Sequence, residues 1–360
     1  MTFNKEKMFR IFISLGLILL FQITINKKSN VALGCTSISL LVRSNKVFGR
    51  NLDVDSDMGN IFINPHGINK TAYFSSTCQE TPAKWTSKYG RITFNQRSKD
   101  IPHVGMNEAG LVVEHLFLGE TQYEQKDSRP AVISHQWVQY MLDNCKDVAE
   151  ITEVAQTIRI SAYDYKFPIH FHVMDKSGDR AIIEFLNGEM IIFRKESYII
   201  GVLANSTYKN SLNKSKEYSN LKKQNVLPTD ISNSIERFIK ASELVESYND
   251  NHYSVIISYS FSILDSVKNS TKWQIVYDLE NLEIHYRTES VTKIRTLSMV
   301  DFSFNESKTI SINDDSDLAA NWLLFSTEIN RTLIHDICDQ SEFINSILGN
   351  EKEEIANYPY

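Results

Sequence analysis

The order of strand-like and helix-like segments constrains the fold more than any other feature of this sequence. Short alternating or apolar runs, typical of strands, occur at residues 35–42, 47–52, 170–174, 181–185, 190–193, 273–277, 283–286 and 294–299. Segments with helical periodicity lie between these groups, at residues 132–145, 147–158, 232–247 and 254–267. Because strands and helices come in separate blocks, the sequence predicts a layered α+β protein and not alternating β–α units.

The chain has no internal repeat, low-complexity tract or recognisable linker. Of its 360 residues 42% are hydrophobic, which is ample for a packed core and excludes a disordered chain. With only 13 Gly and 7 Pro, the chain is not collagen-like. We therefore predict a single domain over residues 35–360. The net charge is −6, and no basic run follows Lys28, so the composition argues against nucleic acid as a partner.

The first 34 residues have the pattern of a secretory signal peptide. A start containing Lys5, Lys7 and Arg10 precedes an apolar stretch at residues 11–25, which is shorter than the roughly 20 residues of a spanning helix. Ala32-Leu33-Gly34 then places small residues at −3 and −1 of a cleavage site. We predict export to the periplasm or the medium, with no stable membrane insertion after cleavage. The alternative is an uncleaved anchor.

Cleavage at this site makes Cys35 the N-terminal residue. Its α-amino group, with a pKa of about 7.7–8.0, could then serve as the general base for its own thiol. Arg50, in the returning strand of a predicted hairpin, could lower the thiol pKa, and Asp53 could hold the amine. In a regular strand, however, Arg50 and Asp53 point to opposite faces. We therefore expect Asp53 to lie past the strand end or beyond a bulge.

Six segments, in this order, resemble the choloylglycine hydrolase family, whose members include bile salt hydrolases and penicillin V acylases. They are Cys35-Thr36-Ser37, GRNLD at residues 49–53, GMNEAGL at 105–111, GVLANS at 201–206, Arg237-Phe238, and Thr271-Lys272-Trp273. The resemblance spans essentially the whole predicted mature chain. It implies an αββα sandwich, in which two antiparallel sheets lie between helical layers.

The resemblance also implies the chemistry. Cys35 would attack a linear amide, form a thioester acyl-enzyme and release an amine, with Arg50 and Asp53 beside it. Asn205 would donate to the oxyanion, and Arg237 would be a charged residue near the nucleophile. Where bile salt hydrolases have an Asn, ungapped counting here gives Phe117, whose backbone N–H would be the second donor. No cofactor or metal is implied.

The substrate and the assembly stay open at this stage. An amide with an apolar or aromatic acyl group, as in penicillin V or an N-acyl homoserine lactone, fits Phe117 better than a conjugated bile salt does. The stretch between Asn205 and Arg237 is shorter than in family members that form tetramers through an extra hairpin, so dimer and tetramer are both open.

Other interpretations of the same residues exist. Cys35 could be lipidated, which would make the chain an inactive, membrane-anchored binding lipoprotein, although Leu33 stands at −2 and not −3. Cys35 could also be an inert buried thiol. His170 and His172 share a strand face and, with His115, could bind zinc, but no further ligand spacing supports this. Cys78, Cys145 and Cys338 allow one disulfide at most.

Overall fold

The structure is a computed structural model that describes residues 34–162, 167–224, 232–248, 253–316 and 321–359. The predicted leader, residues 1–34, lies outside the described residues except for Gly34. None of the described helices is both long and apolar enough to cross a membrane.

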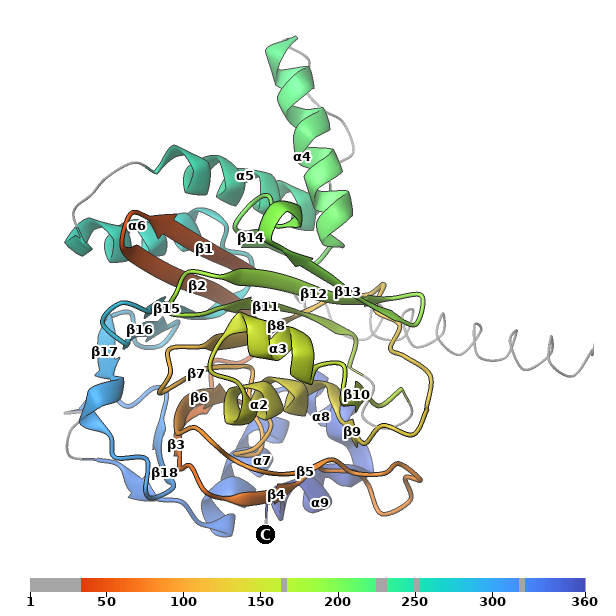
Figure 1. Ribbon diagram of the computed structural model, residues 1–360. Helices are drawn as coiled ribbons and strands as arrows, with labels where there is room; N and C mark the ends of the chain where they lie inside the picture. The colour runs from red at the N-terminus through yellow and green to blue at the C-terminus, as the bar shows by residue number, and fades with distance from the viewer. Residues whose placement is uncertain (1–33, 163–166, 225–231, 249–252, 317–320, 360) are drawn as a thin grey trace, which may run out of the picture.

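Two antiparallel sheets form the centre of the molecule (Figure 1). The first sheet has the strand order β14 (Val202–Leu203), β1 (Thr36–Val42), β2 (Asn45–Asp53), β15 (Thr271–Asp278), β16 (Glu283–Thr288) and β17 (Arg295–Ser298). The second has the order β13 (Glu189–Arg194), β12 (Arg180–Leu186), β11 (Ile169–Met174), β8 (Val112–Phe117), β7 (Val104–Asn107), β6 (Arg91–Asn95), β3 (Asn60–Asn64), β18 (Lys308–Ser311) and β19 (Leu323–Leu324). Two small sheets pair β4 (Asn69–Thr71) with β5 (Lys84–Thr86), and β9 (Ala131–Val132) with β10 (Arg159–Ile160).

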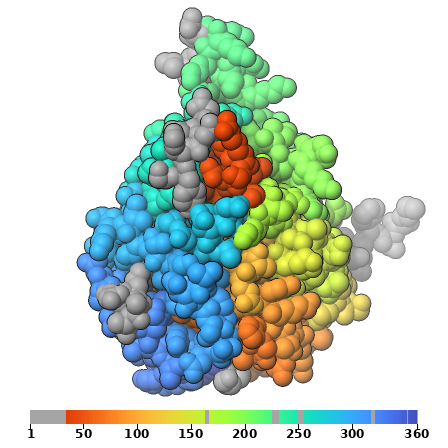
Figure 2. Space-filling model, turned by 60° about the vertical axis from the view of Figure 1, so that its left-hand side comes forward, coloured from red at the N-terminus to blue at the C-terminus, as the bar shows by residue number. Residues whose placement is uncertain are grey.

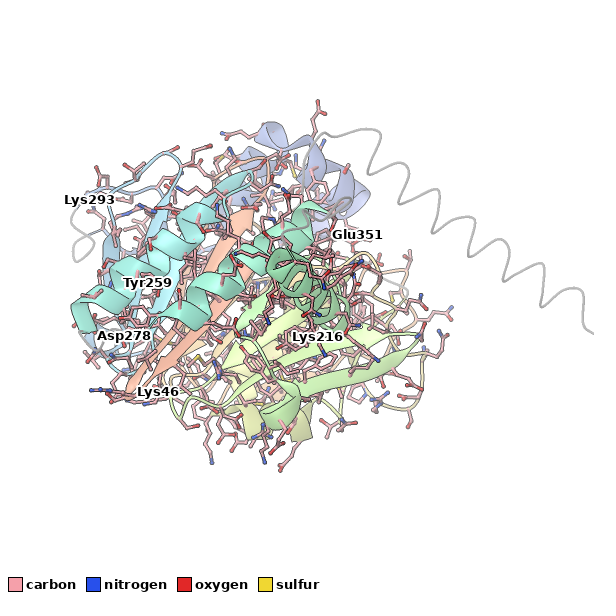
Figure 3. The ribbon with its side chains drawn as sticks, turned by 90° about the horizontal axis from the view of Figure 1, so that it is seen from above. Lys46, Lys216, Tyr259, Asp278, Lys293 and Glu351 are labelled. Atoms are coloured by element: carbon pink, nitrogen blue, oxygen red, sulfur yellow. The ribbon has the colours of Figure 1, made fainter. Side chains whose placement is uncertain are left out.

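Helices cover the outer face of each sheet. The first sheet is covered by α5 (Asn233–Ser247) and α6 (Tyr253–Ser266), which cross the β1–β2 strands when seen from above (Figure 3), and α4 (Tyr208–Lys223) projects beside them. The second sheet is covered by α2 (Ser134–Asn144), α3 (Val148–Val154), α7 (Thr327–Gln340), α8 (Glu342–Leu348) and α9 (Lys352–Ala356). Short 3-10 turns are η1 (Lys195–Ser197), η2 (Met299–Asp301) and η3 (Gly349–Glu351). This arrangement confirms the predicted α+β sandwich with the layer order αββα.

The layers explain where the apolar residues lie. One buried cluster joins the facing sides of the two sheets to α5 and α6, and a second fills the space between the second sheet and α2, α7 and α8. Strands with both faces covered are buried along their whole length, as β7 is, and carry no polar–apolar alternation. For this reason the sequence pattern did not predict the central strands β3, β7 and β8, whereas β6 (RITFN) does alternate and was missed.

The predicted helices α3 and α5 begin within one residue of the expected positions, because capping residues mark their starts. The side chain of Ser232 accepts a hydrogen bond from the Ile235 N–H and begins α5, and Asp147 does the same for the Glu150 N–H in α3. The helix expected at residues 132–145 begins later, because residues 131–132 form strand β9 and α2 begins at Ser134. Pairing of β9 with β10 overrides the helical periodicity there.

The β1–β2 hairpin runs from the surface to the interior. Its turn, near Arg43, lies at the surface between the β11–β12 and β15–β16 segments (Figure 2). Its other end is covered, because residues 34–40 and 47–54 are all buried. Cys35 and the end of β2 therefore meet inside the molecule, next to strand β15 and helix α5.

Candidate active site

Cys35 lies immediately before β1 and is 6% exposed. Strand β1 pairs with β2 on one side and with β14 on the other, so both neighbours bring side chains toward the start of β1. In the described chain Cys35 is still joined to Gly34, and a methyl group placed on Gly34 would lie 2.5 Å from Asn269 Nδ2. A larger residue at this position, immediately before the predicted new N-terminus, would have to displace the exposed Asn269 side chain.

Arg50 approaches the sulfur from the space between the two sheets. Its Nη2 lies 3.7 Å from Cys35 Sγ, and its Nη1 donates to the His103 carbonyl at 3.3 Å. Its Nε lies 3.4 Å from the Glu114 carboxylate, which comes from β8 of the second sheet. Both side chains are almost fully buried. The guanidinium is thus fixed between a carboxylate and the thiol.

Asp53 approaches from the opposite side, next to the helical layer. A methyl group on Gly34 would lie 3.2 Å from Asp53 Oδ2 and 3.3 Å from Arg237 Nη2. The Thr271 hydroxyl donates to Asp53 Oδ1 at 2.5 Å, and the β15–β2 pairing is irregular at this point, between Thr271 and Trp273. Asp53 is the last residue of β2 and pairs with Thr271 at this register shift, so it lies at a bulge, which was one of the two expected positions, and not past the strand end, which was the other. Arg50 and Asp53 flank Cys35 from the two faces of one strand.

Asn205 reaches Cys35 through strand register. Ser37 pairs with Leu203, so continuing the antiparallel register by two residues puts Asn205 opposite Cys35. The close approach of β14 to β1 requires glycine at position 201, because a methyl group there would lie 2.4 Å from the Ser39 carbonyl oxygen. The Asn205 N–H donates to Ser234 Oγ at 2.9 Å, which fixes the residue after the strand ends.

Arg237, on α5, forms hydrogen bonds that link Cys35, Thr36 and Asn205. Its Nη1 donates to the Cys35 carbonyl at 2.5 Å and to the Thr36 hydroxyl oxygen. Its Nη2 donates to Asn205 Oδ1 at 2.9 Å. The guanidinium therefore orients the Asn205 amide, with its Nδ2 end directed away from α5, and holds the Cys35 backbone in place.

Phe117, the last residue of β8, meets Asn205. Asn205 Nδ2 donates to the Phe117 carbonyl at 2.7 Å. The His115 N–H donates to the His103 carbonyl and the Leu118 N–H to the Pro168 carbonyl, so the alternation along the strand directs the Phe117 N–H to the same side as its carbonyl. Both predicted oxyanion donors, the Asn205 amide and the Phe117 N–H, are thus on one side of β8.

Burial raises the pKa of the Cys35 thiol and of both carboxyl groups in the site. Burial raises the pKa of the Cys35 thiol, an effect that Arg50, the Asp53 backbone N–H and Arg237 reduce and the Asp53 carboxylate increases. Burial raises the pKa of Asp53 to about 6 against the Thr271 hydrogen bond and the two arginines. Burial likewise raises the pKa of Glu114 to about 7 against the charge of Arg50. With the Gly34–Cys35 bond intact, the thiol is neutral at pH 7.

Sequence reasoning missed three residues of this site. Glu114 could have been found as a charge within the apolar run VVEHLF, and Thr271 was noted only as part of a motif. His103, in a loop, carried no signal. The GMNEAGL segment is the β7–β8 turn and not part of the site, because Asn107 accepts from the Ala109 and Leu111 N–H groups and donates to α2 carbonyls.

The histidines do not make the zinc site that was considered. His170 Nδ1 lies 3.1 Å from Glu184, and His172 contacts Ser37 and Tyr198 through its two ring nitrogens. Among the described residues, three buried histidines with ring nitrogens close enough to share an ion are His103, His115 and His135. Arg97 Nη1 lies 2.7 Å from His135 Nε2, so a guanidinium already uses that lone pair and its charge opposes a cation. Cys35, Cys145 and Cys338 form no disulfide.

Comparison with known proteins agrees with this geometry. The penicillin V acylase of Pectobacterium atrosepticum is 26% identical over 305 residues, covering 72% of this chain and 79% of that protein. The structure of penicillin V acylase from Agrobacterium tumefaciens superposes with a TM-score of 0.64 at 24% identity, covering 76% of this chain and 90% of that one. A variant of the conjugated bile acid hydrolase from Clostridium perfringens gives a TM-score of 0.63 at 20% identity, covering 80% and 100%.

The sequence profile described as linear amide C–N hydrolases, choloylglycine hydrolase family, matches residues 35–312 and so begins at Cys35. That match takes in all six segments on which the resemblance rested, and the αββα sandwich is also the fold of the superposed structures. The chain therefore belongs to the choloylglycine hydrolase family and is a linear amide C–N hydrolase.

Proposed function

We propose that the active enzyme begins at Cys35 and cleaves its amide substrate with that residue as the nucleophile. The observation that carries the proposal is the position of Cys35, with Arg50 Nη2 3.7 Å from its sulfur and Asp53 Oδ2 close to the preceding residue, 3.2 Å from the position of a methyl group on Gly34. Removal of residues 1–34 would replace a buried peptide bond with an amino group next to the Asp53 carboxylate. An ammonium there would lower the pKa of Asp53 and, with Arg50, that of the thiol.

The reaction then runs in two steps. The Cys35 thiolate attacks the amide carbon after its proton moves to the α-amino group. Asn205 Nδ2 and the Phe117 N–H would stabilise the oxyanion, and the α-amino group would return the proton to the departing amine. Water, activated by the same amino group, hydrolyses the thioester and frees the acid. Arg237 orients the Asn205 amide through Oδ1 during both steps.

The contacts around Phe117 favour an apolar or aromatic acyl group. The Phe117 ring lies 5.8 Å from the ring of Phe167, measured between centroids. We therefore favour penicillin V or an N-acyl homoserine lactone as the substrate type over a conjugated bile salt. Between Asn205 and Arg237 the described residues contain helix α4 and the start of α5. A measurement of the molecular mass in solution distinguishes a dimer from a tetramer.

The alternative, a binding lipoprotein lipidated on Cys35, makes a different use of the same residue. A lipid attached to Cys35 through a thioether would have to extend to the surface from a sulfur atom that is buried against Arg50. The hydrolase requires a free amino group at Cys35, whereas a lipoprotein carries an acylated one. The two interpretations therefore differ in the mass of the N-terminal residue.

The test is the intact mass and N-terminal sequence of the protein exported with its own leader, from the periplasm or medium, followed by an amide panel. We expect an unmodified N-terminal Cys35 and hydrolysis of phenoxyacetyl or acyl homoserine lactone amides. Replacing Cys35 by Ala should abolish turnover while leaving the melting temperature nearly unchanged. A lipidated Cys35, or full activity in the Cys35→Ala variant, would contradict the proposal.

A further inference from the structure

Four buried side chains form a row of hydrogen bonds that leads away from Glu114 between the two sheets. Ser37 Oγ lies 2.6 Å from His172 Nδ1, and His172 Nε2 lies 2.7 Å from the Tyr198 hydroxyl. The Tyr198 hydroxyl lies 2.6 Å from Ser39 Oγ. The two serines come from β1, the histidine from β11 and the tyrosine from the residue after η1, and none of the four is more than 8% exposed. We call these four residues the buried relay.

One end of the buried relay meets the pair of charges beside Cys35. In the first sheet Ser37 is the strand partner of Arg50, and in the second sheet His172 is the strand partner of Glu114. Strand partners point to the same face of a sheet, so these four side chains face one another between the sheets. Burial raises the pKa of Glu114 to about 7, against the charge of Arg50 and a hydrogen bond from Ser37. Glu114 is therefore the group at this end that can gain or lose a proton near neutral pH.

The other end of the buried relay lies beneath Arg180, the first residue of β12. Arg180 Nη1 donates to Ser39 Oγ at 3.2 Å, and the guanidinium carbon lies 4.8 Å from the centre of the Tyr198 ring. Arg180 is partly exposed. Ser39 is therefore one side chain away from solvent.

The protonation states of the buried relay suit proton transfer. Burial lowers the pKa of His172 well below 6.5, and the charges of Arg180 and His170 act in the same direction. The imidazole is therefore neutral at pH 7, with one ring nitrogen that donates and one that accepts. Burial raises the pKa of Tyr198, so its hydroxyl keeps its proton. Each member of the relay can thus accept one hydrogen bond and donate another, as transfer along the row requires.

We propose that the buried relay carries the Glu114 proton to and from the surface, so that Glu114 ionises when Cys35 is acylated and Arg50 loses the thiolate beside it. The proposal rests on the proposed function, since it concerns the charges of that reaction. Arg50 lies between the two acids, with Nη2 3.7 Å from the sulfur and Nε 3.4 Å from Glu114. A buried cation without an anion is costly, and two acids that share one cation titrate together. The thiolate and the carboxylate therefore alternate as the partner of Arg50.

The protons balance over one cycle. On acylation the sulfur becomes a neutral thioester, the amine leaves with the α-ammonium proton, and Glu114 passes its proton to Ser37. The Ser37 proton moves to His172 Nδ1, and the proton on His172 Nε2 moves to Tyr198. Tyr198 passes its proton to Ser39, and one proton leaves to surface water, so the histidine changes from the Nε2–H to the Nδ1–H tautomer. Hydrolysis of the thioester restores the thiolate and the ammonium, and the same transfers in reverse restore neutral Glu114.

The test combines Tyr198→Phe with Glu114→Gln in the exported enzyme that begins at Cys35. Tyr198→Phe removes the hydroxyl between His172 and Ser39, so Glu114 can no longer exchange its proton during turnover. We expect kcat to fall by about tenfold or more. In the Glu114→Gln background no proton has to move, and adding Tyr198→Phe should change kcat by less than about twofold. A loss of packing alone would lower kcat in both backgrounds.

Tyr277→Phe is the matched control. Tyr277 is fully buried and near the charges of Arg50 and Glu114, but its hydroxyl has no hydrogen-bond partner among the described residues. Its replacement should change kcat by less than about twofold. Equal losses from Tyr198→Phe in the two backgrounds, or a similar loss from Tyr277→Phe, would overturn the inference.

A second measurement needs neither turnover nor a relay variant. Alkylation of Cys35 by iodoacetamide gives an uncharged thioether, which imitates the acyl-enzyme in its charge. In infrared difference spectra at pH 7 we expect a protonated carboxyl band to disappear on alkylation, and its absence from Glu114→Gln assigns it to Glu114. A band that persists after alkylation would overturn the inference. An exported enzyme that hydrolyses no amide, with the band still lost on alkylation, would contradict the proposed function instead.

Discussion

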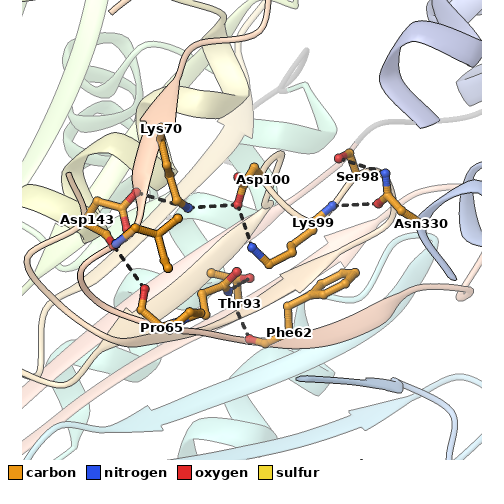
Figure 4. Close-up of polar contacts among 12 residues, drawn as sticks. Phe62, Pro65, Lys70, Thr93, Ser98, Lys99, Asp100, Asp143 and Asn330 are labelled. Carbon is orange, nitrogen blue, oxygen red and sulfur yellow. Dashed lines mark hydrogen bonds and ion pairs between the residues drawn. The ribbon is translucent and has the colours of Figure 1, made fainter. Parts of the chain in front are cut away.

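Two groups of buried charges in this molecule are built in opposite ways. The first, the Asp100 cluster, consists of Lys70, Arg91, Lys99, Asp100 and Asp143. Figure 4 shows Lys70, Lys99, Asp100 and Asp143 together. Lys70 Nζ lies 3.0 Å from Asp100 and 3.5 Å from Asp143, and Arg91 also pairs with Asp143. The second is the group around Cys35, in which the arginines contact the sulfur, carbonyls and neutral side chains as well as acids.

The acids of the two groups respond differently to burial. At Asp100 burial alone would raise the pKa, but three cations together hold it well below its ordinary value. At Asp53 the same burial wins over the more distant Arg237 and Arg50, and the pKa rises to about 6. Close pairing fixes the charge of the first acid, whereas loose pairing leaves the second able to change protonation near neutral pH. We expect the first arrangement to stabilise the fold, and the second fits the proton transfer that the proposed function requires.

The largest expected effect is on the Asp100 cluster. Asp143 binds Arg91, Lys70 and the Trp85 N–H, so Asp143→Ala leaves buried cations without a partner. We expect the free energy of unfolding to fall by about 3–5 kcal/mol in urea denaturation. The exposed Lys272–Glu289 pair provides the control, since Glu289→Ala should cost about 1 kcal/mol or less. Equal losses in the two variants would show that the cluster contributes no special stability.

The next largest effect is expected at Asp53, where removing the charge should raise the free energy of unfolding and not lower it. With the Gly34–Cys35 bond intact, the folded state binds the Asp53 proton more tightly than the unfolded state does, because the pKa is about 6 and not the ordinary 3.8. Stability is therefore lost as the pH rises from about 4 to 6, and the full loss, about 3 kcal/mol, applies above pH 6.

Asp53→Asn keeps an acceptor for the Thr271 hydroxyl and removes this loss. In uncleaved protein carrying Cys35→Ala, it should raise the free energy of unfolding by about 2–3 kcal/mol at pH 7 and hardly at all at pH 3.5. In active enzyme the same change should lower amide hydrolysis, since the new amino group loses its carboxylate. Denaturation curves between pH 3.5 and 8 measure the first effect, and a variant less stable than its parent at pH 7 would contradict it.

The smallest effect concerns Glu114, which neutralises part of the Arg50 charge at a distance of 3.4 Å. Glu114→Gln removes this negative charge, so Arg50 should stabilise the Cys35 thiolate more strongly. We expect the thiol pKa to fall by about one pH unit and alkylation by iodoacetamide at neutral pH to become up to about tenfold faster. The Cys35→Ala protein serves as the blank for the other three thiols.

Glu184 is the control for this change, because it is equally buried in the same sheet but pairs with His170. Glu184→Gln should leave the alkylation rate of Cys35 unchanged. If both variants speed alkylation equally, the effect comes from loosened packing and not from the Arg50 charge.

The sequence alone was sufficient for the family, the α+β layers and six residues that the structure brings together, namely Cys35, Arg50, Asp53, Phe117, Asn205 and Arg237. Local signals carried that information, since caps, turns and short alternating strands are written in neighbouring residues. Asn187 and Gly188, for example, lie between the predicted strand segments 181–185 and 190–193, and both have the positive φ of a tight hairpin turn. The predicted leader and the cleavage before Cys35 remain predictions, because residues 1–33 lie outside the described part of the chain.

The tertiary structure decided what depends on distant pairing. Strand register places Asn205 opposite Cys35, and the two faces of β2 allow Arg50 and Asp53 to flank one sulfur from opposite sides. Glu114 and Thr271 became part of the site only when β8 and β15 were brought next to it. The sequence determined which groups are available, because chemistry is local to each side chain. Only the fold decided which of them meet and how far burial moves their pKa values, because both depend on residues far apart in the chain.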